Sequence, residues 1–254
     1  MPLSKPAAPV RGYIAGLTLS NDGGTPNTIL DIAVGAAADS TGVVTMVLGS
    51  AFTKSTGGAW AVGSGSNGMG NGLTIANATW YHVFLILNGG SVDVYFDTSV
   101  TAANKPTGTT YFRRIGSFLT NGSAAILGFK QDGECFYWSS GTYLDANVSA
   151  STAYNPRASV TLTVPLGVKV RPMLRCSCSS LYLQLTSLDM IGTEVPGASD
   201  NTLQDTTSSS NLHMNAQANL YTNTSSQIGA LTTSSATSFK IRTLGWVDDR
   251  GKFD

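Results

Sequence analysis

Residues 80–97 read WYHVFLILNGGSVDVYFD and combine two strand patterns with a turn between them. Its first eight residues are almost continuously apolar, which is typical of a strand that is buried on both faces. Asn88-Gly89-Gly90 then forms a hairpin-turn sequence, because both central residues of such a turn need positive φ. The remaining residues alternate, with Asp93, Tyr95 and Asp97 on one face and apolar side chains on the other. The stretch therefore predicts an antiparallel hairpin.

Short apolar runs and turn residues continue to alternate on both sides of this hairpin. Asn121-Gly122 separates two apolar runs and predicts a second tight hairpin. We count about ten to fourteen strands at the spacing of β-sandwiches and barrels. No stretch has a convincing helical period: residues 31–39 come nearest, and Gly35 weakens them. The sequence predicts an all-β fold, an antiparallel jelly-roll-like β-sandwich.

The domain organisation is predicted to be one β-sandwich with an extended arm. Residues 1–10 contain three prolines, which lack a backbone donor and favour an extended chain. Pro6 and Pro9 on this arm are candidate contacts with a neighbouring subunit. Residues 11–254 form the sandwich domain. Two stacked β subdomains, with a boundary near residues 150–160, remain an alternative.

The charge balance excludes several classes of protein. The chain has 254 residues, of which 15 are Lys or Arg and 15 are Asp or Glu, and charged residues make up 12%. Without a basic stripe, we expect no nucleic-acid partner. No apolar run approaches the ~20 residues that span a bilayer, so we expect no membrane insertion. The first residues carry no apolar signal core, so no export signal is expected.

The residues that could carry catalysis are few. Glu134 and Glu194 are the only glutamates. Asp93 and Asp97 lie about 13 Å apart at the rise of a strand, which is too far for a glycosidase pair. His82 lies within an apolar strand and is expected to be a core residue. We therefore predict no enzyme, no cofactor and no metal site.

A glycine-rich segment matches a nucleotide-binding pattern without its context. Residues 63–68 fit G-x-G-x-x-G, but that pattern needs a helix after it, and residues 69–72 are poor helix formers. We interpret the segment as a flexible loop. Trp60 precedes it and is the best candidate for an exposed aromatic platform.

Three further side chains are candidates for ligand binding. Sugar rings stack on aromatic faces, and Tyr143 joins Trp60 as a candidate for such contact. Arg113 and Arg114 offer rigid forks of donors, which suit structural or interface hydrogen bonds or, alternatively, an acidic sugar.

The cysteines allow three interpretations. Cys135, Cys176 and Cys178 are an odd number, which argues against a disulfide framework. We expect them to be small buried residues. Two alternatives remain: a metal site that Cys135 completes, or a bridge from Cys176 or Cys178 to another subunit.

Several segments resemble virion proteins of tailed bacteriophages, of the fibre, collar or receptor-binding type. These segments are residues 30–40, 50–54, 80–86, 111–117, 120–123 and 243–248. The strand that begins at Trp80, with its hairpin, is also similar to laminin-G and concanavalin-type lectin sandwiches. No calcium-ligand loop of that lectin type is evident in the sequence.

The resemblance implies a virion structural protein that mediates particle assembly and host attachment. Its expected partners are other virion proteins, further copies of itself (most simply as a trimer) and a host cell-surface glycan. Three alternatives stay open: a purely architectural capsid, collar or tail protein; a free carbohydrate-binding module; and, least supported by the scarce glutamates, a hydrolase.

Overall fold

The computed structural model describes residues 10–140, 143–148, 158–178, 182–189, 204–206, 212–216, 220–232 and 239–252. Within these residues every regular element is a β-strand, which confirms the prediction of an all-β protein. Proline-rich residues 1–9, with Pro6 and Pro9, lie outside the described residues. The described part contains no helix that is long and apolar enough to cross a membrane.

The chain divides into two compact units. Unit 1 comprises residues 1–134 and 249–254, and unit 2 comprises residues 135–248. The sequence predicted one sandwich domain over residues 11–254, with two subdomains that meet near residues 150–160 as the alternative. The division falls earlier because Cys135–Trp138, the first strand of unit 2, pairs with Phe239–Val247, the last one.

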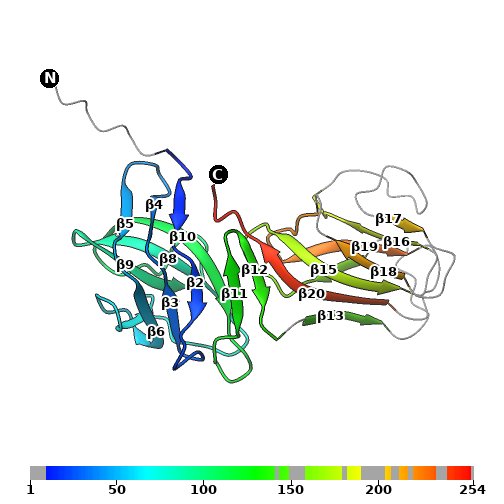
Figure 1. Cartoon of the computed structure of the whole chain (residues 1–254), viewed down its shortest axis with the longest axis horizontal. Coiled ribbons are helices and arrows are strands. Elements are labelled where there is room, and N and C mark those ends of the chain that lie inside the picture. Colours follow the sequence, from blue (N-terminus) through cyan, green and yellow to red (C-terminus); the bar gives the residue numbers. More distant parts are fainter. Residues whose placement is uncertain are drawn as a thin grey trace. The chain divides into compact units, whose positions relative to one another are not determined.

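Unit 1 contains a long sheet with the strand order β10-β8-β9-β7-β6-β3-β2-β11. Figure 1 labels these strands except β7. The pairs are antiparallel, except that β7 runs parallel to both β6 and β9. The bounds are β2 Leu19–Asn21, β3 Ile29–Ile32, β6 Phe52–Ala59, β7 Asn67–Met69, β8 Trp80–Asn88, β9 Ser91–Asp97, β10 Thr109–Leu119 and β11 Phe129–Asp132. A second antiparallel sheet joins β1 Ile14–Gly16, β4 Gly35–Ala38 and β5 Thr45–Leu48.

The β8–β9 hairpin forms as the sequence predicted. Asn88 pairs with Ser91, and the two residues between them, Gly89 and Gly90, have φ of 55° and 85°. Positive φ at both positions is the requirement of a type I′ turn, and glycine meets it without a Cβ clash.

Both faces of this hairpin are covered. On one face, Phe96 packs edge-on against Phe118 of β10, with ring centroids 5.1 Å apart. On the other face, Phe84 stacks on Tyr95 at 5.3 Å, and Trp60 and Phe112 pack against the cluster of Phe84, Ile86, Tyr95 and Ala102. The polar face that the alternation predicted on β9 is therefore also buried.

The Asn121-Gly122 segment forms a longer loop than the sequence predicted. The side chain of Asn121 accepts hydrogen bonds from the N–H groups of Ser123 and Ala125, and Thr120 bridges to Ile126. The residue with positive φ is Ala124, at 58°. A side-chain-stabilised turn thus replaces the two-residue turn.

Unit 1 is completed by residues that follow unit 2 in the chain. Arg113, which is 6% exposed, donates from Nη2 to the carbonyl oxygens of Arg250 and Gly251. Lys252 Nζ lies 2.6 Å from Glu134 Oε1. Gly12, with φ of 82°, lies so close to Lys252 that a Cβ would be 2.0 Å from its carbonyl oxygen.

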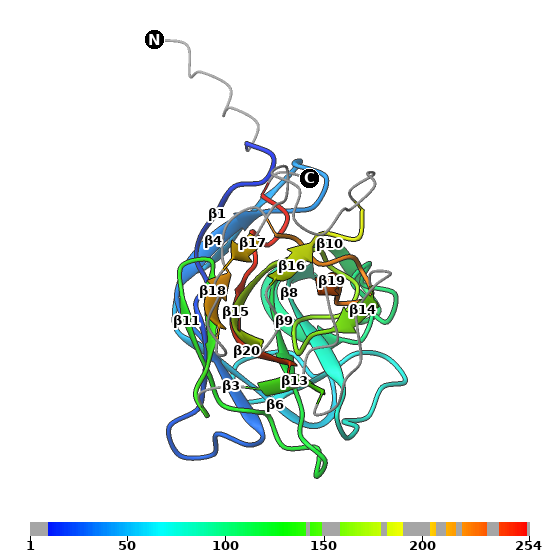
Figure 2. The same cartoon turned by 90° about the vertical axis from the view of Figure 1, so that its right-hand side faces the viewer.

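The described residues of unit 2 form two antiparallel sheets. In the first, β20 Phe239–Val247 pairs with β12 Cys135–Trp138, with β13 Tyr143–Val148 and with β15 Arg171–Cys178, and β15 pairs with β18 Leu212–Ala216. The second has the order β14 Ala158–Thr161, β19 Gln227–Thr232, β16 Tyr182–Thr186 and β17 Gln204–Thr206. Figure 2 shows β13, β20 and β15 on the opposite side of unit 2 from β14, β19 and β16.

The core of unit 2 is built on stacked aromatic rings. Phe136 lies parallel to Trp246 with centroids 5.1 Å apart, and Trp138 lies 5.1 Å from the same tryptophan. Gly245 precedes Trp246, and a Cβ there would lie 2.0 Å from the carbonyl oxygen of Phe136. Only glycine lets β20 approach β12 this closely.

Candidate functional site

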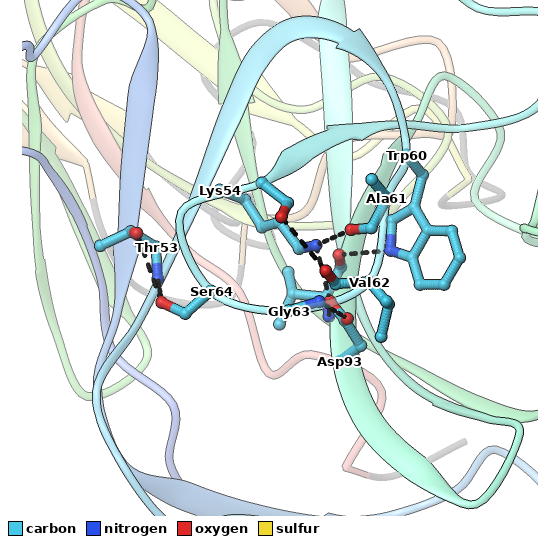
Figure 3. A network of polar contacts seen from close by, with 10 residues as sticks. Thr53, Lys54, Trp60, Ala61, Val62, Gly63, Ser64 and Asp93 are labelled. Carbon is cyan, nitrogen blue, oxygen red and sulfur yellow. Dashed lines mark hydrogen bonds and ion pairs between the residues drawn. The ribbon is translucent and has the colours of Figure 1, made fainter.

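A glycine-rich loop, residues 60–66, connects β6 to β7 and folds back along β6 (Figure 3). Gly63 and Gly65 have φ of 99° and 79°, which suits residues without a Cβ. The amide of Thr53 donates to Ser64 Oγ at 3.0 Å, and the amide of Gly65 donates to the carbonyl oxygen of Thr53 at 3.0 Å. Because β7 begins at Asn67, no helix follows this loop, and the nucleotide-binding context is absent.

A buried ion pair lies under this loop. The side chains of Lys54 on β6 and Asp93 on β9 are 0% and 1% exposed, and Nζ lies 2.8 Å from Oδ1. Lys54 Nζ also donates to the carbonyl oxygen of Ala61 at 2.6 Å. Asp93 Oδ2 accepts from the amide of Gly63 at 2.7 Å, and Oδ1 accepts from the amide of Val94 at 2.6 Å. The pair therefore ties the loop to two strands.

The surroundings of the ion pair are aromatic. Lys54 Nζ lies 5.5 Å from the ring centroid of Phe52 and 5.4 Å from that of Trp60, within cation–π range. Burial lowers the pKa of Lys54, and the hydrogen bond and charge of Asp93 oppose this shift.

Trp60 is half-buried in the structure. Its Nε1 donates to the carbonyl oxygen of Val94 at 3.2 Å, and its ring packs against the cluster around Phe84. Only part of the ring is therefore open to a ligand, so Trp60 offers less stacking surface than the sequence suggested. At the tip of the loop, Val62 is 64% exposed.

The other candidate ligand-binding residues lie elsewhere. Arg113 uses Nη2 inside unit 1, and Arg114 Nη1 donates to Ser117 Oγ at 3.2 Å, so both make the structural hydrogen bonds that the sequence allowed. Tyr143 belongs to unit 2, where its ring lies 4.8 Å from that of Trp138.

Two of the three cysteine side chains lie within the described residues. Cys176 is 1% exposed on β15, as expected of a small buried residue, and Cys135 is half-buried. The side chain of Cys178 lies outside the described residues. Within the described part of the chain, no group of three His, Cys, Asp or Glu side chains is placed to hold a metal ion.

Two more buried aspartates stabilise loops of unit 1. Asp39 accepts from the amides of Thr41, Val43 and Val44 and from the hydroxyl of Thr41. Burial opposes ionisation of Asp39, but these hydrogen bonds outweigh it and lower the pKa of the carboxyl group.

Asp97 also accepts four hydrogen bonds. Its Oδ2 accepts from the Tyr95 hydroxyl at 3.1 Å and from the amide of Asn104 at 2.9 Å. Its Oδ1 accepts from the amide of Ser99 at 2.9 Å and from Asn104 Nδ2 at 2.8 Å. The side chain is 0% exposed, so all four donors are satisfied away from water.

His82 is a core residue, as predicted. It is 1% exposed, and its Nδ1 lies 2.9 Å from Ser117 Oγ. The imidazole is thus enclosed and cannot reach a substrate at the surface.

Sequence reasoning missed Lys54. The alternation of β6 places it between Phe52 and Thr56 on the inward face, and an inward lysine requires a partner. That signal was present in the sequence, but the partner of Lys54, Asp93, lies 39 residues further along the chain and two strands away, on the far side of β7.

No protein-family model, curated protein or solved structure matches the chain.

Proposed function

We propose that the chain is a non-catalytic structural component of a tailed-phage virion, which serves in assembly and in attachment to the host surface. Its architecture in this proposal is a jelly-roll-like β-sandwich that assembles as a homo-oligomer, most simply a trimer. The low charge, the all-β fold and the segments that resemble virion proteins support this role.

The observation that carries the proposal is how unit 1 uses its buried acids. Asp39, Asp93 and Asp97 all accept hydrogen bonds from backbone amides of loops, and Asp93 is also paired with Lys54. A general acid or base must reach a substrate, whereas these carboxylates are enclosed and occupied. Such use of charge suits a rigid scaffold that presents loops.

Attachment is proposed to occur through loops such as residues 60–66. Weak binding of a glycan to one copy becomes strong when several linked copies bind together, by roughly 10²–10⁴-fold. The partly open ring of Trp60 and the exposed Val62 are the contact residues of this loop.

A purely architectural variant of this role is favoured by one group of exposed apolar side chains. Val47 on β5 is 58% exposed, and Tyr13, Val34 and Val43, next to the strands of the same small sheet, are 45%, 53% and 59% exposed. Apolar side chains gathered in this way favour contact with further copies of the chain.

Two measurements on the full-length protein test the proposal. Light scattering should show an oligomer, and a monomer at high concentration would contradict it. Immobilised bacterial surface polysaccharides should retain the wild-type protein, and Trp60→Phe should weaken retention. Tyr137→Ala, which removes an aromatic side chain of 41% exposure in unit 2, is the matched control. Cleavage of any polysaccharide would refute the non-catalytic role. If Trp60→Phe is retained as strongly as the wild-type protein, the loop of residues 60–66 is not part of the binding surface.

A further inference from the structure

The ammonium group of Lys54 and the carboxylate of Asp93 are in direct contact, as two groups that react with each other must be. Nζ and Oδ1 are 2.8 Å apart in a site that is closed to water, because the two side chains are 0% and 1% exposed. A second lysine–carboxylate pair in unit 1, Lys252–Glu134, has a similar separation of 2.6 Å but side-chain exposures of 29% and 31%. The two pairs differ chiefly in how far water is excluded.

We propose that Lys54 and Asp93 condense to an amide, which forms a covalent cross-link between β6 and β9 inside unit 1. The proposal rests on the contact distance, the burial of both groups and the donors and acceptors around them. It does not depend on the proposed virion function.

The reaction balances without a co-reactant. One ammonium proton of Lys54 passes to Asp93 Oδ1, which leaves an amine and a carboxylic acid. Nζ then forms a bond to Cγ, and the bond between Cγ and Oδ1 breaks. Oδ1 departs as water with this proton and a second one from Nζ, and the third stays on the amide nitrogen. No group is oxidised or reduced in this reaction.

The neighbouring groups are placed to favour each stage. The carbonyl oxygen of Ala61, 2.6 Å from Nζ, orients the amine and then accepts the amide N–H. The amide of Gly63, 2.7 Å from Oδ2, donates to the oxygen on which negative charge develops when the tetrahedral intermediate forms. Burial, which lowers the pKa of Lys54, increases the share of nucleophilic amine.

The product relieves the main cost of the site. Two buried charges are expensive to keep out of water even when paired, and an amide replaces them with one neutral group. The amide also keeps hydrogen-bond partners, since its N–H faces Ala61 and its oxygen faces Gly63.

A glycine on β7 leaves room beside the side chain of Lys54. β7 lies between β6 and β9 in the sheet. A Cβ on Gly68 would lie 2.9 Å from Phe96 Cε2 and 3.3 Å from Lys54 Cβ. A side chain at this position would therefore displace Lys54 or Phe96.

The intact mass of the purified full-length protein tests the proposal. We expect a mass lower than that of the sequence by one water molecule. Chymotrypsin cuts between the two residues, at aromatic positions such as Trp80, and should release a branched peptide that joins the Lys54 and Asp93 segments. The full sequence mass after long incubation of the folded protein would overturn the proposal.

Two variants and one reagent separate this cross-link from other losses of water. Lys54→Gln should restore the full mass, and Lys252→Gln, which removes the exposed pair, should leave the deficit unchanged. Hydroxylamine opens a cyclic imide at an Asp-Gly step such as Asp132-Gly133 but leaves an amide intact. A deficit that hydroxylamine removes, or that maps away from Lys54, would count against the cross-link. If Lys54→Gln does not fold, the branched peptide of the wild-type protein decides alone.

Discussion

The replacement Asp97→Asn tests how strongly one carboxylate holds the loop after β9. The substitution keeps the shape of the side chain but converts one acceptor oxygen into an NH₂ donor. If the NH₂ group replaces Oδ2, the Tyr95 hydroxyl can rotate and accept, but the amide of Asn104 loses its partner. If it replaces Oδ1, the Asn104 side chain can flip, but the amide of Ser99 loses its partner.

Either orientation leaves one buried backbone N–H unpaired, which costs about 1–3 kcal/mol, and it weakens the remaining charge-assisted bonds. We expect Asp97→Asn to lower the free energy of unfolding by about 2–3 kcal/mol. Asp97→Ala, which removes both acceptors from four donors, should cost about 4 kcal/mol or more. Tyr95→Phe removes one donor and keeps the carboxylate, so it should cost about 1 kcal/mol.

Urea titration of the full chain gives the free energies, and hydrogen exchange of residues 98–104 locates the effect. The expected order is Asp97→Ala, then Asp97→Asn, then Tyr95→Phe. A loss below about 1 kcal/mol for Asp97→Asn, or equal losses for Asp97→Asn and Tyr95→Phe, would contradict this prediction, because the carboxylate would then contribute no more than an amide.

Three further predictions follow from contacts in the two units. Gly245→Ala brings a methyl group against the Phe136 carbonyl oxygen and should destabilise unit 2 by about 3 kcal/mol. Hydrogen exchange of β12 and β20 measures this loss. A loss of stability near zero would contradict the close approach of the two strands. The pKa of Asp39 is lowered from its ordinary 3.8, so the ionised carboxylate contributes its full stability above pH 3.8 and loses it as the pH falls through the folded pKa. Asp39→Asn should therefore make the melting temperature depend less on pH on the acid side. An unchanged pH dependence would contradict this. Arg113→Met leaves two carbonyl acceptors without these donors and should cost about 1–3 kcal/mol, with faster hydrogen exchange at residues 249–252; unchanged exchange there would contradict the assigned contact.

Local patterns in the sequence were sufficient to predict an all-β protein and the central hairpin, but the twenty strands of the described residues exceed the ten to fourteen that these patterns indicated. The glycines at residues 89 and 90 predict their own backbone conformation, because few other residues adopt positive φ at both positions of a turn. The Asn121-Gly122 pair was misleading, because Asn-Gly occurs both in two-residue turns and in longer loops that an asparagine side chain stabilises, as Asn121 does here.

The ion pair and the division into units could not be predicted in this way. Asp93 meets Lys54 only because β7 inserts between β6 and β9 with parallel pairing, which no local period encodes. Likewise, residues 249–252 belong to unit 1 through the side chains of Arg113 and Glu134, more than a hundred residues earlier.

This return of the chain has a consequence for proteolysis. A single cut of the backbone anywhere in residues 135–248 divides the polypeptide but isolates neither unit, since the fragment that begins at Met1 lacks residues 249–252 and the other fragment carries them. The nicked molecule keeps the hydrogen bonds from Arg113 to Arg250 and Gly251 and the ion pair of Glu134 with Lys252, so it should elute as one species until a denaturant separates its two fragments.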